Sequence, residues 1–386
     1  MLRCNILTIF LAFSLLAGAQ DWKVVREHPQ KAFPKKVAAG NYSGIAHLHD
    51  DIYAVVSDKS DSALYFNFRI QVNPKTGEPE QVENLGFTER IDGTLNDGKP
   101  WQGLEKGFDH EAIVKVSDST LVIASEGYCR LKEYPILPTS ADAAKVDYQQ
   151  NLWESRWPSA DFYPNYNFES LAFDSVRQYL WTIPESTLRK DGQPATPQNG
   201  LANQLRLMRL DWGKIKENRN KEAYCEQVNS KKVNSKKDSR YMVTYAYRMD
   251  QPSTHKKADI YVMGVSELCA LPDGQLLVLE REAFIPKIKI GAFCKCKLYQ
   301  INPLNFENFS MKENISSDTP FLKKKLLTEW KTSLSLSKRS FANYEGMCLG
   351  PKLEDGSQVV ILLSDSQDQY AGVLKDWFKT IVIRKE

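Results

Sequence analysis

The chain repeats one pattern of hydrophobic and polar positions along its length. Each copy has a short apolar run, a turn, and a second apolar run that ends near a carboxylate. Runs this short, rich in Val, Ile, Leu and Tyr, predict β-strands, and the polar turns between them predict antiparallel hairpins. The copies are Ser43–Leu48 with Ile52–Asp58, Glu111–Val116 with Leu121–Glu126, Glu169–Phe173 with Tyr179–Glu185, Glu267–Leu271 with Gln275–Glu280, and Glu345–Leu349 with Gln358–Asp365.

Less apolar, alternating segments follow most of these hairpins and predict half-exposed outer strands. They are Ala63–Ile70, Gln204–Asp211, Met242–Arg248 and Lys297–Ile301. Two inner and two outer strands in each repeat predict an all-β fold, a β-propeller with four-stranded antiparallel blades. Five blades are visible, and a degenerate sixth remains an alternative. We expect Trp22–Arg26 to pair with the last blade and close the ring, and the polar stretch Trp212–Arg240 to be a loop insertion.

The N-terminus has the order of a secretory signal peptide. Arg3 precedes the apolar run Ile6–Leu16, and Ala17-Gly18-Ala19 follows as a small-residue cleavage site. We therefore expect residues 1–19 to be removed, and residues 20–386 to form one propeller domain in a secreted or periplasmic protein. No later apolar segment has the length of a membrane span.

Charge, missing motifs and cysteine spacing limit the classes of function that the sequence predicts for this chain. The chain has 386 residues with a formal net charge of +3 and no long basic run, which predicts no nucleic-acid partner. It lacks the Gly-x-Ser-x-Gly of serine esterases and the His-Glu-x-x-His of zinc hydrolases. Cysteine spacing fixes no disulfide pairing, and Cys269 and Cys348 lie in apolar runs that predict buried free thiols.

The acidic residues of the repeat are expected to meet. In an antiparallel hairpin the start of the first strand lies beside the end of the second. The expected neighbours are Glu111 with Glu126, Glu169 with Glu185, Glu267 with Glu280, and Glu345 with Asp365, with Asp58 opposite Ser43. Two carboxylates about 4 Å apart repel by roughly 4 kcal/mol at an effective dielectric constant near 20, so a ring of them needs protons, basic partners or a cation. Oxygen ligands favour Ca²⁺.

These expectations assign candidate roles at one mouth of the channel. The candidate catalytic residues are Glu111, Glu169, Glu345 and His110. The candidate Ca²⁺ ligands are Asp58, Glu126, Glu185, Glu267, Glu280 and Asp365, and the candidate substrate-binding residues are Lys59, Arg130 and Arg281. The alternative is structural: such acids cap turns, accept amides of the next blade or pair with arginine between blades, and His110 is then a turn residue.

Several motifs resemble the phytase-like ("esterase-like activity of phytase") family over roughly residues 40–380. They are Asp109-His-Glu-Ala-Ile with Ala124-Ser-Glu126, Asn167-Phe-Glu-Ser-Leu-Ala172 with Pro184-Glu185, Leu276-Leu-Val-Leu-Glu-Arg281, and Asn343-Tyr-Glu-Gly-Met with Leu363-Ser-Asp365. The chain departs from the usual Glu-Gly at Glu111-Ala112 and Glu169-Ser170. The resemblance implies a propeller, export, and cleavage of phosphate or other esters.

Two functions follow as hypotheses. The first is a Ca²⁺-dependent phosphoester hydrolase that acts on a small anionic or phosphorylated substrate. The second is a non-catalytic propeller that binds a ligand or protein and uses its acids, or a Ca²⁺ ion, for structure.

Overall fold

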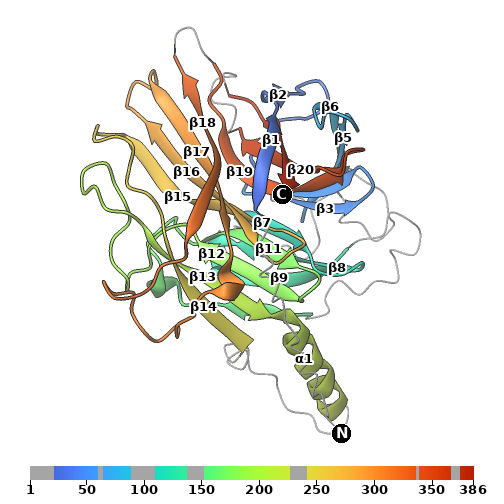
Figure 1. Ribbon diagram of the computed structural model, residues 1–386, viewed down its shortest axis with the longest axis vertical. Helices are drawn as coiled ribbons and strands as arrows, with labels where there is room; N and C mark the ends of the chain where they lie inside the picture. The colour runs from blue at the N-terminus through green and yellow to red at the C-terminus, as the bar shows by residue number, and fades with distance from the viewer. Residues whose placement is uncertain are drawn as a thin grey trace, which may run out of the picture.

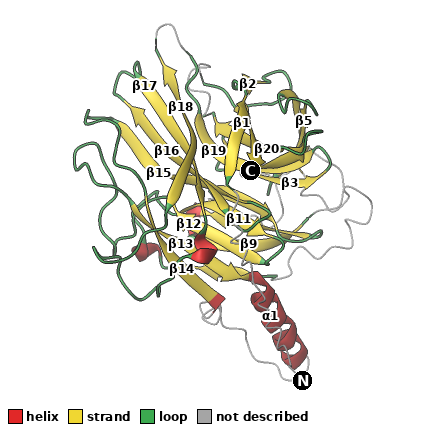
Figure 2. Ribbon diagram, viewed as in Figure 1, coloured by secondary structure: helices red, strands yellow, loops and turns green. Residues whose placement is uncertain are grey.

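The computed structural model describes residues 21–59, 64–87, 109–136, 152–226, 241–335, 339–366 and 374–386, so the predicted signal peptide lies outside the described residues. The strands form five antiparallel sheets of four strands, one of them with a short fifth strand, arranged as the blades of a propeller (Figure 1). Strands dominate the described part of the chain, and α1 is its one α-helix (Figure 2). The predicted five-bladed propeller is confirmed, without a sixth blade in the described residues.

The first three blades follow the chain in order. Blade one contains β3 (Tyr42–His49), β4 (Ile52–Ser57), β5 (Phe66–Val72) and β6 (Pro79–Phe87). Blade two contains β7 (His110–Lys115), β8 (Thr120–Ser125), β9 (Arg130–Pro135) and β10 (Glu154–Arg156). Blade three contains β11 (Phe168–Asp174), β12 (Tyr179–Pro184), β13 (Gln204–Asp211) and β14 (Met242–Arg248).

Blade four has the longest strands, and blade five joins both ends of the chain. Blade four contains β15 (Ile260–Ala270), β16 (Leu276–Ile285), β17 (Ala292–Ile301) and β18 (Lys324–Leu334). Blade five contains β19 (Asn343–Lys352), β20 (Gln358–Asp365), β21 (Trp377–Lys385) and β1 (Trp22–Glu27), and β2 (Lys31–Ala32) also pairs with β21.

Pairing of β1 with β21 closes the ring, as expected from the sequence. The two strands are antiparallel, with Trp22 opposite Lys385 and Glu27 opposite Ile381. Strands from the two ends of the chain therefore share one sheet, and this shared sheet closes the ring of blades.

The hydrophobic core lies between neighbouring blades. Inner strands β3, β7, β11, β15 and β19 follow one another around the axis. Between blades three and four, Ile183 packs with Val278, and between blades one and five, Val55 packs with Ile361; all four side chains are fully buried. Because sheets cover both faces of these strands, their apolarity is continuous rather than alternating. Cys269 and Cys348 are buried free thiols, as predicted.

The stretch that begins at Trp212 was expected to be a loop, and this is wrong for its first part. Residues Trp212–Glu226 form α1, while residues 227–240 lie outside the described part. The carboxylate of Asp211 accepts the amide of Lys214 at 3.1 Å and caps the first turn. Trp212 and Ile215 are fully buried, and Trp212 packs edge-on against Trp153. The helix was not predicted because these two buried residues, in an otherwise charged segment, do not produce a helical hydrophobic period in the sequence.

Each inner strand has a bulge, which lies near the strand start in β3, β7, β11 and β19 and within the strand in β15. The residues left without a partner in the register are Ser43, Glu111, Glu169, Ser266 and Glu345. A bulge turns its extra residue out of the ladder, which aims these side chains differently from their neighbours. Neighbouring blades approach closely here: a Cβ on Gly44 would lie 2.7 Å from the carbonyl oxygen of Glu111. The five bulges place equivalent residues around one end of the axis.

No helix in the described residues is long and apolar enough to cross a lipid bilayer.

Candidate functional site

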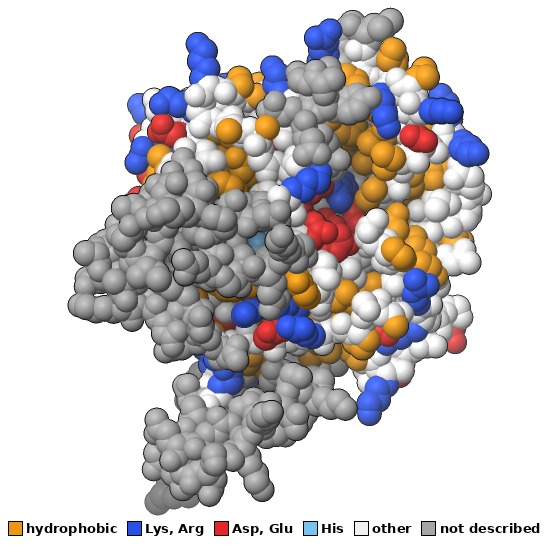
Figure 3. All heavy atoms as spheres, turned by 180° about the vertical axis from the view of Figure 1, so that it is seen from behind, with side chains coloured by type: hydrophobic (Ala, Val, Ile, Leu, Met, Phe, Trp, Pro, Cys, Tyr) orange, Lys and Arg blue, Asp and Glu red, His pale blue; other side chains and the backbone are white. Residues whose placement is uncertain are grey.

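The bulges and the ends of the second strands bring acidic side chains together at one mouth of the propeller. The equivalent bulge positions hold Ser43, Glu111, Glu169, Ser266 and Glu345. The equivalent positions on the second strands lie at or just after the strand end in blades one, two, three and five and within β16 in blade four, and they hold Asp58, Glu126, Glu185, Asp365 and Arg281. On the face seen in Figure 3, acidic side chains gather in a central hollow. We call this set, with Asp109, the mouth cluster.

The fourth hairpin is shifted by one residue from the register that the sequence suggested. Val265 lies opposite Glu280, and Glu267 lies opposite Leu279, so the expectation that Glu267 neighbours Glu280 is wrong. The residues equivalent to the other acids are instead Ser266 and Arg281. Blades three and four approach closely here, because a Cβ on Gly264 would lie 2.4 Å from the carbonyl oxygen of Glu185.

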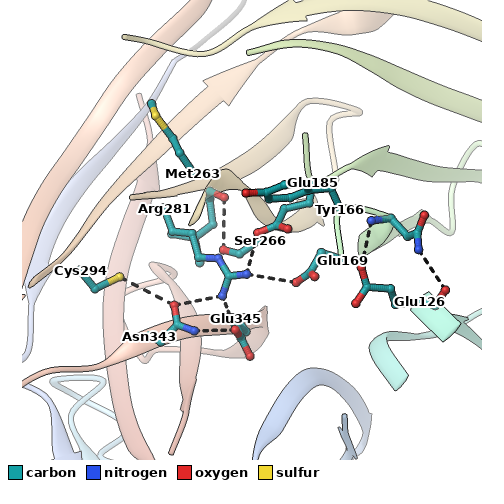
Figure 4. A network of polar contacts seen from close by, with 12 residues as sticks. Glu126, Tyr166, Glu169, Glu185, Met263, Ser266, Arg281, Cys294, Asn343 and Glu345 are labelled. Carbon is teal, nitrogen blue, oxygen red and sulfur yellow. Dashed lines mark hydrogen bonds and ion pairs between the residues drawn. The ribbon is translucent and has the colours of Figure 1, made fainter. Parts of the chain in front are cut away.

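Arg281 joins three blades through its guanidinium (Figure 4). Nη2 donates to Glu185 at 2.7 Å and lies 3.4 Å from Glu169. Nη1 donates to the side-chain oxygen of Asn343 at 3.0 Å and to Glu345. Arg281 is only 6% exposed. It was predicted to bind substrate, but Nη1 and Nη2 already bind protein side chains, and Nε is buried without a hydrogen-bond partner among the described residues.

Burial and charge both act on the carboxylates around Arg281. Burial raises the pKa of Glu185 and of Glu345, and the charge of Arg281 opposes that rise. Burial, followed by repulsion from Glu185, raises the pKa of Glu169 well above its usual range. This side of the mouth cluster is thus only partly neutralised by its one guanidinium.

The other side of the mouth cluster lacks such a partner. In the described part of the chain, no lysine or arginine forms an ion pair with Asp109, Glu111 or Glu126, whereas Asp58 has Lys59 at 3.9 Å. Glu111 is 7% exposed, and a carboxylate oxygen of Glu111 lies within 4.8 Å of one of Asp109. Two carboxylates this close repel each other unless a proton or a cation compensates their charge.

The pKa values on this side are raised as a consequence. Burial, then repulsion from Asp365 and Glu345, raises the pKa of Asp58 to about 8. Burial, then repulsion from Glu185, raises the pKa of Glu126 to about 7. Burial and four neighbouring carboxylates raise the pKa of Glu111 well above its usual range. Protons or a cation must therefore compensate these charges at neutral pH.

The geometry of the mouth cluster fits a hard cation. Oxygen atoms of Asp58, Asp109 and Glu111 all lie within 4.8 Å of one another, and so do oxygens of Glu111, Glu126 and Glu169. These donors are all carboxylate oxygens, which suits Ca²⁺ better than zinc or copper. One oxygen of Asp58 is buried without a hydrogen-bond partner among the described residues. The residues present therefore fit Ca²⁺.

Asp109 was not among the predicted site residues. Its backbone has φ of 51°, in the left-handed region, and so does that of the equivalent Asn41, with φ of 48°. Asn and Asp tolerate this conformation better than most residues. A polar residue two positions before the bulge in four of the five blades, also seen at Asn167 and Asn343, was the sequence signal that could have identified Asp109.

Glu267 lies apart from the mouth cluster and fastens neighbouring inner strands. Its Oε1 accepts the amides of Leu171 at 2.9 Å and Leu268 at 3.0 Å. Glu267 is 1% exposed, and burial raises its pKa well above the usual range. These hydrogen bonds join blades three and four, as in the structural alternative considered above for these acids.

Glu280 faces away from the mouth cluster. Its Oε1 accepts the hydroxyl of Tyr247 at 2.6 Å and the ammonium of Lys324 at 2.7 Å, between blades three and four. Asp365 stays with the mouth cluster, since its charge raises the pKa of Asp58. Of the six predicted Ca²⁺ ligands, Glu267 and Glu280 are therefore the two that the structure separates from the others.

The predicted histidine and the remaining basic residues lie in three different environments. His110 is 1% exposed, its Nδ1 lies 2.9 Å from Ser125 Oγ, and burial, with the charge of Arg130, lowers its pKa to about 3. Arg130 is also buried, 3.9 Å from Glu154 and against the ring of Tyr128. Lys59 is half-exposed beside Asp58, so of the three predicted substrate-binding residues it is the one at the rim of the mouth.

The fold and the mouth cluster define a five-bladed propeller with a carboxylate-rich mouth. This chain belongs to the phytase-like family, described as "Esterase-like activity of phytase", whose profile matches residues 37–367.

Similarity to solved structures is distant. An endo-arabinase from Bacteroides thetaiotaomicron is 8% identical with a TM-score of 0.40, over 93% of this chain and 99% of that one. Virginiamycin B lyase from Staphylococcus aureus is 8% identical with a TM-score of 0.31, over 94% of this chain and 99% of that one. No curated protein sequence matches the chain.

Proposed function

We propose that this chain is an exported, Ca²⁺-dependent hydrolase of phosphate esters that binds a small anionic substrate at the mouth cluster. Membership of the phytase-like family supports the reaction class. The observation that carries the proposal is the group of Asp109, Glu111 and Glu126, of which Glu111 is buried and the other two are half-buried, and which has no basic ion-pair partner among the described residues.

Charge explains why such a substrate needs the cation. A phosphate ester that approaches the mouth cluster meets many carboxylates, while Arg281 already binds Glu169, Glu185 and Glu345. Each close pair of like charges costs roughly 4 kcal/mol at an effective dielectric constant near 20. A divalent cation held by Asp58, Asp109, Glu111 and Glu126 reverses that repulsion locally, and binding of an anion becomes favourable.

Each side chain then has a distinct task. Bound Ca²⁺ supplies polarisation of a phosphoryl oxygen and a more acidic water. Glu126, with a pKa of about 7, lies in the range in which a carboxylate accepts a proton from an attacking water. Arg281 holds Glu169 and Glu345 in fixed positions around the mouth, and Lys59 attracts the anionic substrate at the rim. His110 is neutral and buried, so we propose no proton transfer by it.

The test is hydrolysis of a generic phosphomonoester by the purified mature chain, with Ca²⁺ and with a chelator. We expect turnover with Ca²⁺ and at least a hundredfold loss in Glu111→Gln, Glu169→Gln and Glu345→Gln. Glu354→Gln, in the exposed turn between β19 and β20, is the matched control and keeps full activity. Turnover that survives the chelator, or that is equal in all four variants, contradicts the proposal.

The second candidate function is a non-catalytic binding propeller. The observation that favours it is the guanidinium of Arg281, which binds Glu169, Glu185 and Glu345 as ties between blades. On this alternative, Ca²⁺ raises the melting temperature but no phosphomonoester is hydrolysed. Export is part of the main proposal, and N-terminal sequencing of the secreted protein tests cleavage after Ala19.

A further inference from the structure

Blade four extends beyond the mouth cluster. The second strands of blades two, three and five end at Ser125, Pro184 and Asp365, beside the mouth. By contrast, β16 continues from Arg281 to Ile285, paired with β15 on one side and, to Phe284, with β17 on the other. At roughly 3.4 Å per residue, this extension adds on the order of 14 Å in the direction in which the mouth opens. Figure 1 shows β15–β18 projecting beyond the other blades.

The end of this extension exposes large hydrophobic side chains. Ile260 is 49% exposed, Ile288 76% and Ile290 48%. Ile260 lies opposite Ile285 in the sheet, and the amide of Ile290 donates to the carbonyl of Ile288 in the turn between β16 and β17. Single exposed apolar residues are ordinary on protein surfaces, but these three share one protruding end.

Basic side chains surround the same isoleucines. The segments 255–260 and 286–291 contain Lys256, Lys257, Lys287 and Lys289, and Asp259 is their one acidic residue. Asp259 lies 3.5 Å from Lys289, which leaves the other lysines to set the sign of the local charge. We call residues 255–260 and 286–291 the blade-four tip.

We propose that the blade-four tip binds an anionic phospholipid surface. Three isoleucines flanked by lysines match the usual composition of a shallow interfacial anchor, in which apolar side chains enter the acyl boundary and lysines contact lipid phosphates. A stable protein interface buries about 800 Å² on each partner, more than a turn and a strand end present. The inference goes beyond the proposed hydrolysis and does not depend on it.

The test is co-sedimentation of the full chain with vesicles of phosphatidylcholine alone and of phosphatidylcholine with phosphatidylglycerol, at low and high salt. We expect binding to the anionic vesicles that weakens at high salt. Lys257→Gln with Lys287→Gln should weaken it by about twenty-fivefold, since each lysine near an anionic surface contributes about fivefold. Ile288→Ser should weaken it by about tenfold through loss of apolar insertion.

Matched controls use residues of similar exposure elsewhere. The first control is Val176→Ser, at a residue 72% exposed in the β11–β12 turn, at the end of blade three away from the mouth. The second is Lys75→Gln, in the β5–β6 turn. Both should bind vesicles like the parent chain. No binding to anionic vesicles overturns the proposal, and so does equal loss in tip and control variants. A dimer in solution that Ile288→Ser dissociates overturns it in favour of a second copy of this chain.

Discussion

Arg281 Nη2 lies 2.7 Å from Glu185 Oε1 across the boundary between blades three and four. Arg281 occupies the position at which the other four blades place Asp58, Glu126, Glu185 and Asp365. Because blade four places a basic residue where the other four blades place an acid, one half of the mouth cluster is held by a guanidinium and the other half is not. The second half is where a cation is expected to bind.

Replacing Arg281 by Met should destabilise the protein strongly. The change leaves Glu169, Glu185 and Glu345 buried without a cation, and breaking such a pair typically costs about 3–5 kcal/mol. Urea denaturation measures the loss in the free energy of unfolding. The matched control is Arg69→Gln, whose side chain is 42% exposed and pairs with surface acids, and which should cost less than about 1 kcal/mol. Equal losses in the two variants contradict the assignment.

Without Ca²⁺, stability should fall as pH rises. The folded-state pKa of Asp58, about 8, and of Glu126, about 7, lie above the ordinary values of these groups near 4. The folded state then binds more protons than the unfolded state between about pH 4 and pH 8, so the free energy of unfolding decreases through that window. Thermal melts at several pH values with chelator measure the slope. Added Ca²⁺ should remove most of it, and a rising slope would disprove the assignment.

Ca²⁺ affinity should depend on Glu111 and not on Glu280. Glu111 belongs to both groups of converging carboxylate oxygens, whereas Glu280 binds Tyr247 and Lys324 away from them. We expect Glu111→Gln to weaken Ca²⁺ binding at least tenfold in calorimetry. Glu280→Gln is the matched control and should leave the affinity within about twofold. If Glu280→Gln weakens binding as much as Glu111→Gln, the cation lies elsewhere.

Glu267 should tolerate Gln but not Leu. Burial raises its pKa well above the usual range, which favours the neutral carboxyl, and Gln keeps a neutral oxygen acceptor at the same place. We expect Glu267→Gln to change the free energy of unfolding by less than about 1 kcal/mol. Glu267→Leu leaves the amides of Leu171 and Leu268 without this acceptor and should cost about 3 kcal/mol or more. Urea denaturation of both variants tests this, and similar costs would refute it.

The fold could be predicted from the sequence because its signals are local and repeated. Apolar runs with polar turns identified the inner hairpin of every blade, and Trp22–Arg26 identified the closing strand. Sequence analysis did not predict helix α1. Among the α1 residues whose side chains are described, Trp212 and Ile215 are the deeply buried ones, and two such positions do not produce a helical hydrophobic period.

The candidate site was harder to predict because it depends on register. In blade four, aligning acid with acid placed Glu267 and Glu280 at the mouth, whereas the bulge at Ser266 moves both by one residue. A shift of one residue in a strand moves a side chain to the other face. The partners of Arg281 come from two other blades, and no local pattern in the sequence indicates that a basic residue will be surrounded by acids.

The sharing of blade five between the two ends of the chain has a consequence for biogenesis. Among the described strands, β1 is the first to be synthesised, and it has no partner until the last, β21, has been made, because β21 is the strand with which it pairs. A chain that is still being synthesised therefore carries an unpaired β1 until β21 is complete. A product cut short before Trp377 would lack β21 and could not close the ring of blades.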